Sequence, residues 1–175
     1  YEATTDIMSN PEETRPETRK VLTSTAEIRD AILEITANAQ RSVAIFTQDL
    51  EPFAYDDDQF IEIIKRLILA RSFARVRVLL ADPYRAIRDG NRLVGLGRRL
   101  SSYVEFRNVH KDFREQHGEA YLVADDKGVV YRADARRMHG IADSSNRGVA
   151  RKYLEEFDHI WHASYAEPEF RRLHL

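Results

Sequence analysis

The side chains with the clearest chemical potential in this sequence are basic, and the chemistry they could support is anion binding. Arg132, Arg136 and Arg137 follow one apolar run, and Arg107 and His110 lie at the end of another. Guanidinium groups match phosphate oxygens, so these residues could hold a phosphorylated ligand or a nucleic-acid backbone. Mixed charges are more often a solvated surface, which favours a solvated loop in which Arg132, Arg136, Arg137 and their basic neighbours pair with Asp134 and Asp143.

Metal binding has weaker support in the sequence. Asp49 and Asp82 follow two apolar runs and could hold a divalent cation, but carboxylates there more often cap the next helix. The three adjacent aspartates at 56–58 would point in different directions on one turn, which favours a helix start. His159 and His162 have metal-ligand spacing but no further ligand set. The sequence therefore predicts no metal site and no cofactor.

Length and composition place general limits on the protein. The 175 residues suit one domain in which helices cover a sheet. A formal net charge of −2 gives no global attraction to nucleic acid or acidic membranes, so any anion binding must be local. The absence of cysteine excludes thiolate chemistry and suits a cytoplasmic protein. No apolar run approaches the ~18 residues of a membrane span, so we expect no membrane partner.

The domain organisation is expected to be simple. Residues 1–20 are polar, contain Pro11 and Pro16, and are typical of a flexible arm or linker. Residues 21–175 should form a single α/β domain. Because the chain begins at Tyr1 rather than Met, we expect it to be a piece of a longer protein with a neighbouring domain.

Helices and strands alternate along the expected domain. Apolar runs predict strands over 21–23, 42–48, 75–81, 103–107, 120–124 and 129–132. Helical periodicity predicts helices over 24–39, 59–72 and 147–162, and a broken helical region over 84–100 that Gly90, Gly95 and Gly97 interrupt. Residues 133–146 are expected to be irregular. This order indicates an α/β fold with a mixed, mostly parallel sheet flanked by helices. Ligands of such a sheet would bind beyond the ends of the parallel strands, at residues 47–49, 82–84 and 107–110.

A hairpin should lie at the centre of the sheet. Its two strands flank the tight turn Asp125-Asp126-Lys127-Gly128, where Gly128 can supply the positive φ that such turns need. The hairpin and the order of elements from Ser24 to Trp161 resemble the second half of a phospholipase-D-like domain. In that family a strand opens with the motif His-x-Lys-x-x-x-x-Asp, and placing its aspartate on Asp125 puts Gly118 at the histidine and Ala120 at the lysine.

The resemblance implies a fold without the chemistry of the family, whose histidine forms a phosphohistidine while a lysine neutralises the phosphate. None of the six histidines has a lysine two residues later, and His117 has Glu119 there. The family's Gly-Ser-x-Asn would fall on Arg132, Ala133 and Ala135, so it is absent too. The chain also resembles uncharacterised bacterial domains with a similar ending, Phe170 to Leu175, some of them joined to acetyltransferase-like domains, which implies an accessory module.

The function expected from these features is a non-catalytic phospholipase-D-like binding or regulatory module. Single-copy members of that fold tend to be dimeric, so a homodimer is expected, with a nucleic acid, a phosphorylated ligand or a neighbouring domain as further partners. The alternative is a divergent phosphodiesterase or nuclease that uses a non-standard set such as Glu119, His110 and Arg107. A purely structural role, as a dimerisation element for a catalytic neighbour, is a third interpretation.

Overall fold

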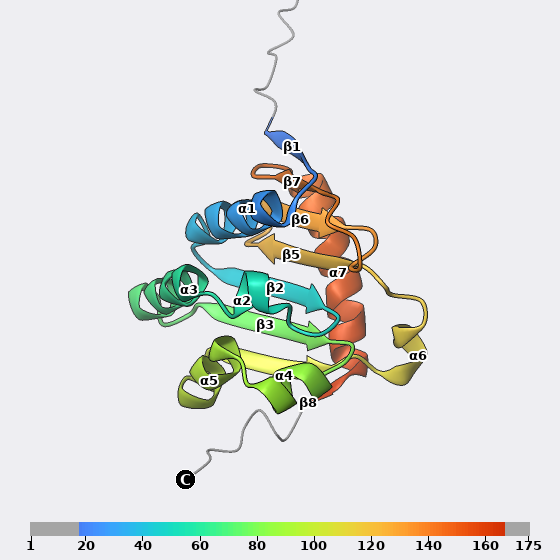
Figure 1. Cartoon of the computed structure of the whole chain (residues 1–175). Coiled ribbons are helices and arrows are strands. Elements are labelled where there is room, and N and C mark those ends of the chain that lie inside the picture. The colour runs from blue at the N-terminus through green and yellow to red at the C-terminus, as the bar shows by residue number, and fades with distance from the viewer. Residues whose placement is uncertain (1–17, 167–175) are drawn as a thin grey trace, which may run out of the picture.

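An eight-stranded sheet in the order β1-β7-β6-β5-β2-β3-β4-β8 forms the centre of the computed structural model, which describes residues 18–166 (Figure 1). The strands are β1 (Arg19–Leu22), β2 (Ser42–Thr47), β3 (Arg75–Leu80), β4 (Val104–Asn108), β5 (Ala120–Ala124), β6 (Gly128–Arg132), β7 (Gly140–Asp143) and β8 (Tyr165–Ala166). The helices are α1 (Thr25–Ala37), α2 (Pro52–Tyr55), α3 (Asp58–Ala70), α4 (Tyr84–Asp89), α5 (Arg92–Arg99), α6 (Lys111–Arg114) and α7 (Arg147–Ala163). The α/β prediction is confirmed. Most of the predicted arm lies outside the described residues, but the prediction is wrong for Arg19 and Lys20, which belong to β1 and pair with β7.

The sheet is mixed, but the prediction that it is mostly parallel is wrong. Only β2 with β3 and β3 with β4 pair in parallel among the described strands. On the other side of β2, strand β5 of the hairpin pairs antiparallel with β2. Each following pair out to the edge, β5 with β6, β6 with β7 and β7 with β1, is antiparallel too. The hairpin lies near the middle of the sheet, as predicted, and it reverses the strand direction there.

Two apolar layers cover the two faces of the sheet. Helices α1, α3 and α5 pack on one face and α7 crosses the other, as Figure 1 shows. Successive side chains of β2 alternate between these layers, with Val43 and Ile45 on the first and Ala44 and Phe46 on the second. A strand buried on both faces needs an almost continuous apolar run, which is why β2 could be identified from the sequence.

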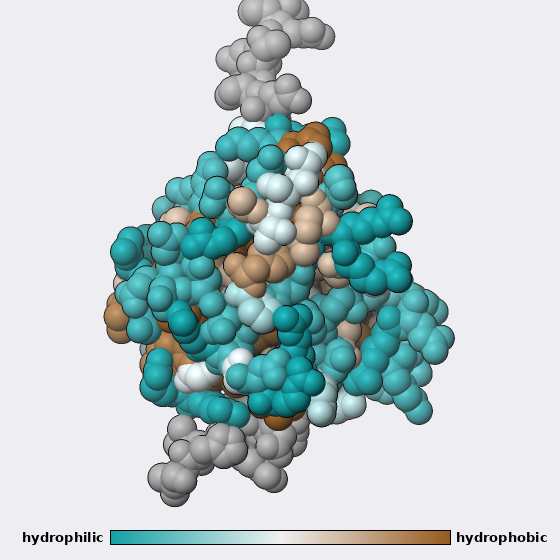
Figure 2. All heavy atoms as spheres, viewed as in Figure 1, coloured by the Kyte–Doolittle hydropathy of each residue, from teal (hydrophilic) through white to brown (hydrophobic). Residues whose placement is uncertain are grey.

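The face covered by α1 to α5 is largely hydrophilic on its outer surface, with smaller pale and brown areas (Figure 2). In the part of the chain that the structure describes, no helix combines the length and the apolar character needed to cross a bilayer.

The hairpin turn differs from its prediction at one position. The positive φ falls on Asp125, at 55°, and not on Gly128, which begins β6. The Asp125 carboxylate accepts hydrogen bonds from three successive backbone N–H groups, those of Gln40, Arg41 and Ser42, at 2.8–3.2 Å. This left-handed conformation is one that aspartate tolerates, and it ties the turn to the start of β2.

Two further predictions need correction. Of the three glycines in the 84–100 region, only Gly90, with φ of 72°, separates two helices, since Gly95 and Gly97 lie inside α5. A Cβ on Gly97 would lie 2.5 Å from Cε2 of Phe106, so this glycine is required by close packing. The predicted irregular segment 133–146 contains strand β7, which pairs with both β6 and β1.

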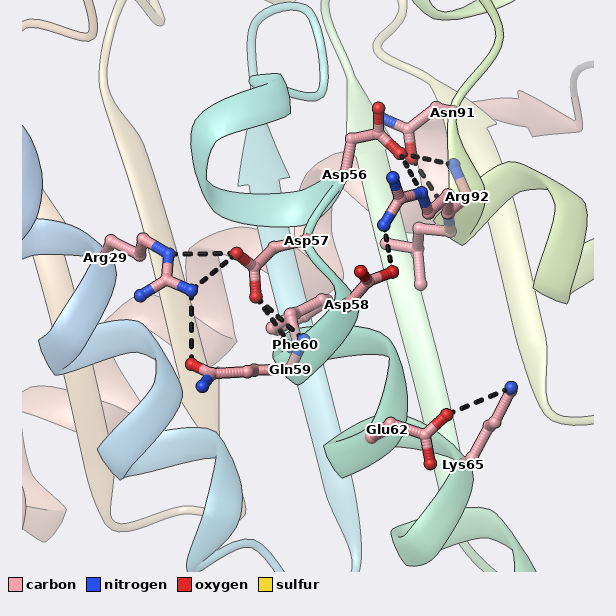
Figure 3. A network of polar contacts seen from close by, with 11 residues as sticks. Arg29, Asp56, Asp57, Asp58, Gln59, Phe60, Glu62, Lys65, Asn91 and Arg92 are labelled. Carbon is pink, nitrogen blue, oxygen red and sulfur yellow. Dashed lines mark hydrogen bonds and ion pairs between the residues drawn. The ribbon is translucent and has the colours of Figure 1, made fainter.

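The start of α3 is held by a network of polar contacts with α1 and α5 (Figure 3). The Asp57 carboxylate accepts the backbone N–H groups of Gln59 and Phe60, both at 3.0 Å, and the Arg29 guanidinium of α1 at 2.7 and 2.9 Å. Asp58, beside it, makes an exposed ion pair with Arg92. The predicted role as a helix start is confirmed for Asp57 and Asp58, whereas Asp56 accepts the Arg92 N–H at the start of α5, at 2.9 Å.

Replacing Asp57 with alanine should lower the free energy of unfolding by about 1–2 kcal/mol, because the helix loses its N-cap. Partial burial acts to raise the pKa of Asp57, but the Phe60 N–H and Arg29 outweigh it and hold the pKa below the ordinary value. A carboxyl group with a lowered folded-state pKa contributes stability above its unfolded pKa of about 4, and this contribution is lost as the pH falls through the folded pKa.

Urea unfolding at pH 7 and in acid would check both expectations for Asp57. The difference between the wild type and Asp57→Ala should shrink in acid, whereas Asp58→Ala should cost less than about 1 kcal/mol at either pH. Equal losses for the two variants at pH 7 would contradict the assignment of the cap.

Candidate functional site

The carboxyl ends of the parallel strands share one edge of the sheet with the start of β5. Since β5 runs antiparallel to β2, with Phe46 opposite Tyr121, the residues before β5 lie beside those after β2. The Gln48 side-chain amide fixes this junction by donating to the backbone carbonyls of His117, at 3.0 Å, and Glu119, at 2.9 Å. The edge at which ligands were expected therefore includes the segment that leads into the hairpin.

One histidine and two glutamates meet at this edge. His117 Nδ1 lies 2.6 Å from Oε1 of Glu119 and 3.1 Å from Oε1 of Glu156 on α7. The three side chains are only 12–35% exposed. The imidazole lies near the Phe46 and Phe113 rings, with centroid distances of 6.0 and 6.3 Å. We refer to His117, Glu119 and Glu156 as the His–Glu–Glu cluster.

Local structure explains why these three side chains meet. Alternation along β5 places Glu119 on the same face as Tyr121, which packs in the apolar layer beneath α7. On α7, Glu156 shares a helix face with Tyr153 and the buried Ile160, both packed in this layer, so the packing of that face brings Glu156 towards the sheet. Burial raises the pKa of Glu156, and the hydrogen bond and charge of Glu119 raise it further, while His117 and Lys152 act in the opposite direction. The cluster is thus a place where negative charge is concentrated and partly desolvated.

Aromatic side chains continue the site under α7. Tyr121 stacks on Phe46 with centroids 5.2 Å apart, and Tyr153 lies 5.2 Å from Tyr121 and 4.7 Å from Tyr131. The Tyr121 hydroxyl is buried and has no hydrogen-bond partner among residues 18–166. Burial, followed by the charges of Glu156 and Glu119, raises the pKa of Tyr121, so the hydroxyl stays protonated near these two carboxylates.

Two of the predicted anion-binding residues lie near the end of β4. The Arg107 guanidinium donates to Glu105, at 3.2 Å, and to the Trp161 carbonyl, at 3.0 Å, and lies 4.3 Å from the centroid of the Trp161 ring. The His110 ring accepts the Asp112 N–H at 3.2 Å and so caps the short helix α6. Both side chains already have protein partners.

The other three predicted residues lie at the end of β6, on the other side of the sheet's centre. Arg132 is buried and pairs with the buried carboxylate of Glu51. Arg136 and Arg137 are exposed and share Asp134, as the solvated-loop interpretation predicted. That interpretation is wrong for Arg132, which is buried, and for Asp143, which accepts hydrogen bonds from Thr18, Ser145 and Asn146. Strands β5, β2 and β3 separate β6 from β4. The structure therefore does not bring the five residues to one place.

The metal candidates that the sequence suggested have other contacts. Asp49 pairs with Arg85 at 2.8 Å, and Asp82 accepts the Tyr84 N–H at the start of α4. His159 packs edge-to-face against Phe113, with centroids 5.6 Å apart.

The His–Glu–Glu cluster was missed, because sequence reasoning tested His117 only for a following lysine. The sequence offered two signals. His117 and Glu119 stand at alternate positions before a strand, and Glu156 lies next to a buried residue of the final helix.

Comparisons with known proteins agree on the fold. A family model described as "Domain of unknown function (DUF7931)" matches residues 24–173. No curated protein matches the chain. TrmBL2, described as an archaeal chromatin protein with a novel mode of DNA binding, matches with a TM-score of 0.65 at 14% identity, and the match covers 92% of this chain and 57% of TrmBL2.

Two phospholipase D relatives among the solved structures match over nearly their whole length. Nuc from Salmonella typhimurium, a phospholipase D family member, has a TM-score of 0.58 and 14% identity over 85% of this chain and 97% of its own. NucT from Helicobacter pylori has a TM-score of 0.54 and 13% identity over 85% of this chain and 98% of its own. The domain thus has a phospholipase-D-like α/β fold, and at these identities the likeness extends to the fold alone.

Proposed function

We propose that this chain, which belongs to the family described as "Domain of unknown function (DUF7931)", is a binding or regulatory module that keeps the phospholipase-D-like fold without its catalysis. The proposal includes two partners that stay predictions, a second copy of the chain and a neighbouring domain that the module would serve.

The observation that carries the proposal is the pair of carboxylates around His117. Phosphoryl transfer to an imidazole needs positive charge beside it to hold the phosphate, whereas the side chains within 3.1 Å of His117 Nδ1 are Glu119 and Glu156. A phosphate charge and a carboxylate charge about 4 Å apart would repel each other by about 4 kcal/mol at an effective dielectric constant of about 20. A phosphodiester would therefore be disfavoured at the one imidazole that lies at the start of β5.

The alternative, a divergent phosphodiesterase using Glu119, His110 and Arg107, has less support. His110 and Arg107 follow β4, while Glu119 precedes β5, and strands β2 and β3 lie between β4 and β5. General acid–base catalysis needs the groups within hydrogen-bond reach of one substrate atom. The contacts of Arg107 and His110 with α7 and α6 also hold both side chains in place.

Nucleic acid is a second candidate ligand, favoured by the similarity to TrmBL2, whose description includes DNA binding. The exposed guanidinium groups of Arg136 and Arg137 are the groups that would meet a phosphate backbone. Asp134 offsets one of these two charges, so any such binding should be weak and sensitive to salt.

A turnover assay tests the proposed lack of catalysis. We expect no hydrolysis of bis(p-nitrophenyl) phosphate above the protein-free rate, with chelator or with added Mg²⁺, Mn²⁺ or Zn²⁺, across neutral and mildly acidic pH. His117→Ala and His110→Ala should give the same result as the wild type. Turnover that His117→Ala abolishes and His162→Ala leaves intact would overturn the proposal, and turnover that requires His110 would favour the alternative enzyme.

A further inference from the structure

The geometry of the His–Glu–Glu cluster matches a metal site more closely than an ordinary surface ion pair. One imidazole nitrogen and two carboxylate oxygens, one from each residue, all lie within 4.8 Å of one another. They come from two elements, the segment before β5 and helix α7, and all three side chains are more than half buried. A cation between them would need only small side-chain movements to reach each ligand atom.

The donor set indicates which cation would fit. Imidazole nitrogen combined with carboxylate oxygen suits Zn²⁺ and its neighbours, whereas Mg²⁺ and Ca²⁺ prefer oxygen ligands alone. Two carboxylates and a neutral imidazole would offset the double positive charge of the ion. Three protein ligands would leave a coordination position of a tetrahedral ion for water or another group.

The Tyr121 hydroxyl is an independent observation that points to a ligand in this place. Tyr121 is only 2% exposed, and its hydroxyl is one of the few buried side-chain polar atoms in residues 18–166 that lack a hydrogen-bond partner. Its side chain projects from the same face of β5 as Glu119, and its ring lies 5.2 Å from that of Tyr153, which is one turn before Glu156 on α7. Buried polar groups are normally hydrogen-bonded to protein or to ordered water. A water bound to the metal would give the Tyr121 hydroxyl such a hydrogen-bond partner.

The backbone that carries two of the ligands is also held in place. The Gln48 amide donates to the carbonyls of His117 and Glu119, and so fixes the two positions relative to β2. The rings of Phe46 and Phe113 flank the imidazole and limit its rotation. Supporting contacts of this kind orient the ligands in known metal sites.

We propose that His117, Glu119 and Glu156 bind a divalent transition-metal ion, best matched by Zn²⁺, with the Tyr121 hydroxyl hydrogen-bonded to water on the ion. The proposal goes beyond the binding role inferred above. A bound ion would offset the two carboxylate charges, but it would also occupy the His117 nitrogen as a ligand, so that nitrogen would still not be free to accept a phosphoryl group. The contrary interpretation is a protonated histidine held by two glutamates, with no affinity for metal.

Metal titration of the chelator-treated full chain distinguishes the two interpretations. By calorimetry, Zn²⁺ should bind at one site per chain, Co²⁺ more weakly, and Mg²⁺ not measurably. Co²⁺ should give visible absorption bands of a low-coordinate site, and Zn²⁺ should remove them by displacement. Absence of one-site Zn²⁺ binding to the folded wild type would overturn the proposal without bearing on the turnover assay.

Ligand variants locate the site. Glu156→Gln and Glu119→Gln keep the side-chain shape and should each weaken Zn²⁺ binding by more than about 100-fold, while Tyr121→Phe should weaken it by about 10-fold, as supporting contacts do. The matched controls are Glu155→Gln, the exposed neighbour on α7, and His162→Ala, both of which should bind as the wild type does. Wild-type affinity in both folded glutamine variants, checked by circular dichroism, would place the ion elsewhere and refute the assignment.

Discussion

Replacing Arg132 with methionine is expected to lower the free energy of unfolding by about 3–5 kcal/mol, the usual cost of removing one partner from a buried ion pair. Arg132 is 4% exposed and Glu51 8% exposed, so the carboxylate that remains could not reach water without local opening. The guanidinium also donates to the carbonyls of Ala135, at 3.1 Å, and Arg137, at 3.3 Å, and these lose their donor as well. Burial already raises the pKa of Glu51 while Arg132 opposes that rise, so the variant should unfold more easily as the pH increases.

Chemical denaturation of four variants gives the measurement its controls. Arg136 lies four residues after Arg132, and its side chain is 89% exposed. Arg136→Met should therefore change the free energy of unfolding by no more than about 0.5 kcal/mol. Glu51→Leu together with Arg132→Met should lose less than Arg132→Met alone, because no charge then remains buried. The double-mutant cycle with the single Glu51→Leu variant isolates the pairwise energy. An Arg132→Met variant as stable as Arg136→Met would show that the pair does not matter for the fold.

The second large effect is expected at Phe157 on α7. Its side chain is fully buried, stacks on Trp161 with centroids 5.7 Å apart, and lies 4.9 Å from the Arg77 guanidinium. Phe157→Ala should cost about 3–5 kcal/mol, since it removes a large ring and leaves a cavity between the helix and the sheet. Thermal and urea unfolding would measure this loss directly.

The matched control for Phe157 is Phe73, which is 56% exposed in the loop before β3. Phe73→Ala should stay within about 0.5 kcal/mol of the wild type. A loss at Phe157 below about 1 kcal/mol would mean that α7 is not packed against the sheet as described, and would remove Glu156 from its position beside His117.

Local sequence signals were sufficient wherever an element is defined by its own residues. Ser24 caps helix α1, with its hydroxyl accepting the Glu27 N–H at 3.1 Å, and the Glu27 carboxylate accepts the Thr23 N–H at 3.0 Å. The hairpin strands were found because apolar runs flank a turn of polar residues and glycine. Strand β7 was missed because residues 140–143 become a strand only through pairing with β6 and β1, which are contributed by other parts of the chain.

The candidate site could not be assembled from the sequence for a related reason. Glu156 belongs to the final helix, which was predicted over 147–162, but nothing local indicates that it faces His117 across the sheet edge. Arg132 had the residue type of an anion-binding group, and its partner Glu51 lies in a distant loop. The direction of β5 relative to β2, which brings His117 to the ligand edge, is likewise a property of the whole sheet.

The placement of β1 and β8 at opposite edges of the sheet has a consequence for engineering (Figure 1). With strands about 4.8 Å apart, the two outermost strands of an eight-stranded sheet are separated by about 34 Å. A circular permutant that joins Ala166 to Arg19 would need a connecting peptide of at least about ten extended residues. Two fluorophores attached next to β1 and next to β8 would therefore lie at opposite edges of the sheet. Energy transfer between them would measure the distance across the folded sheet.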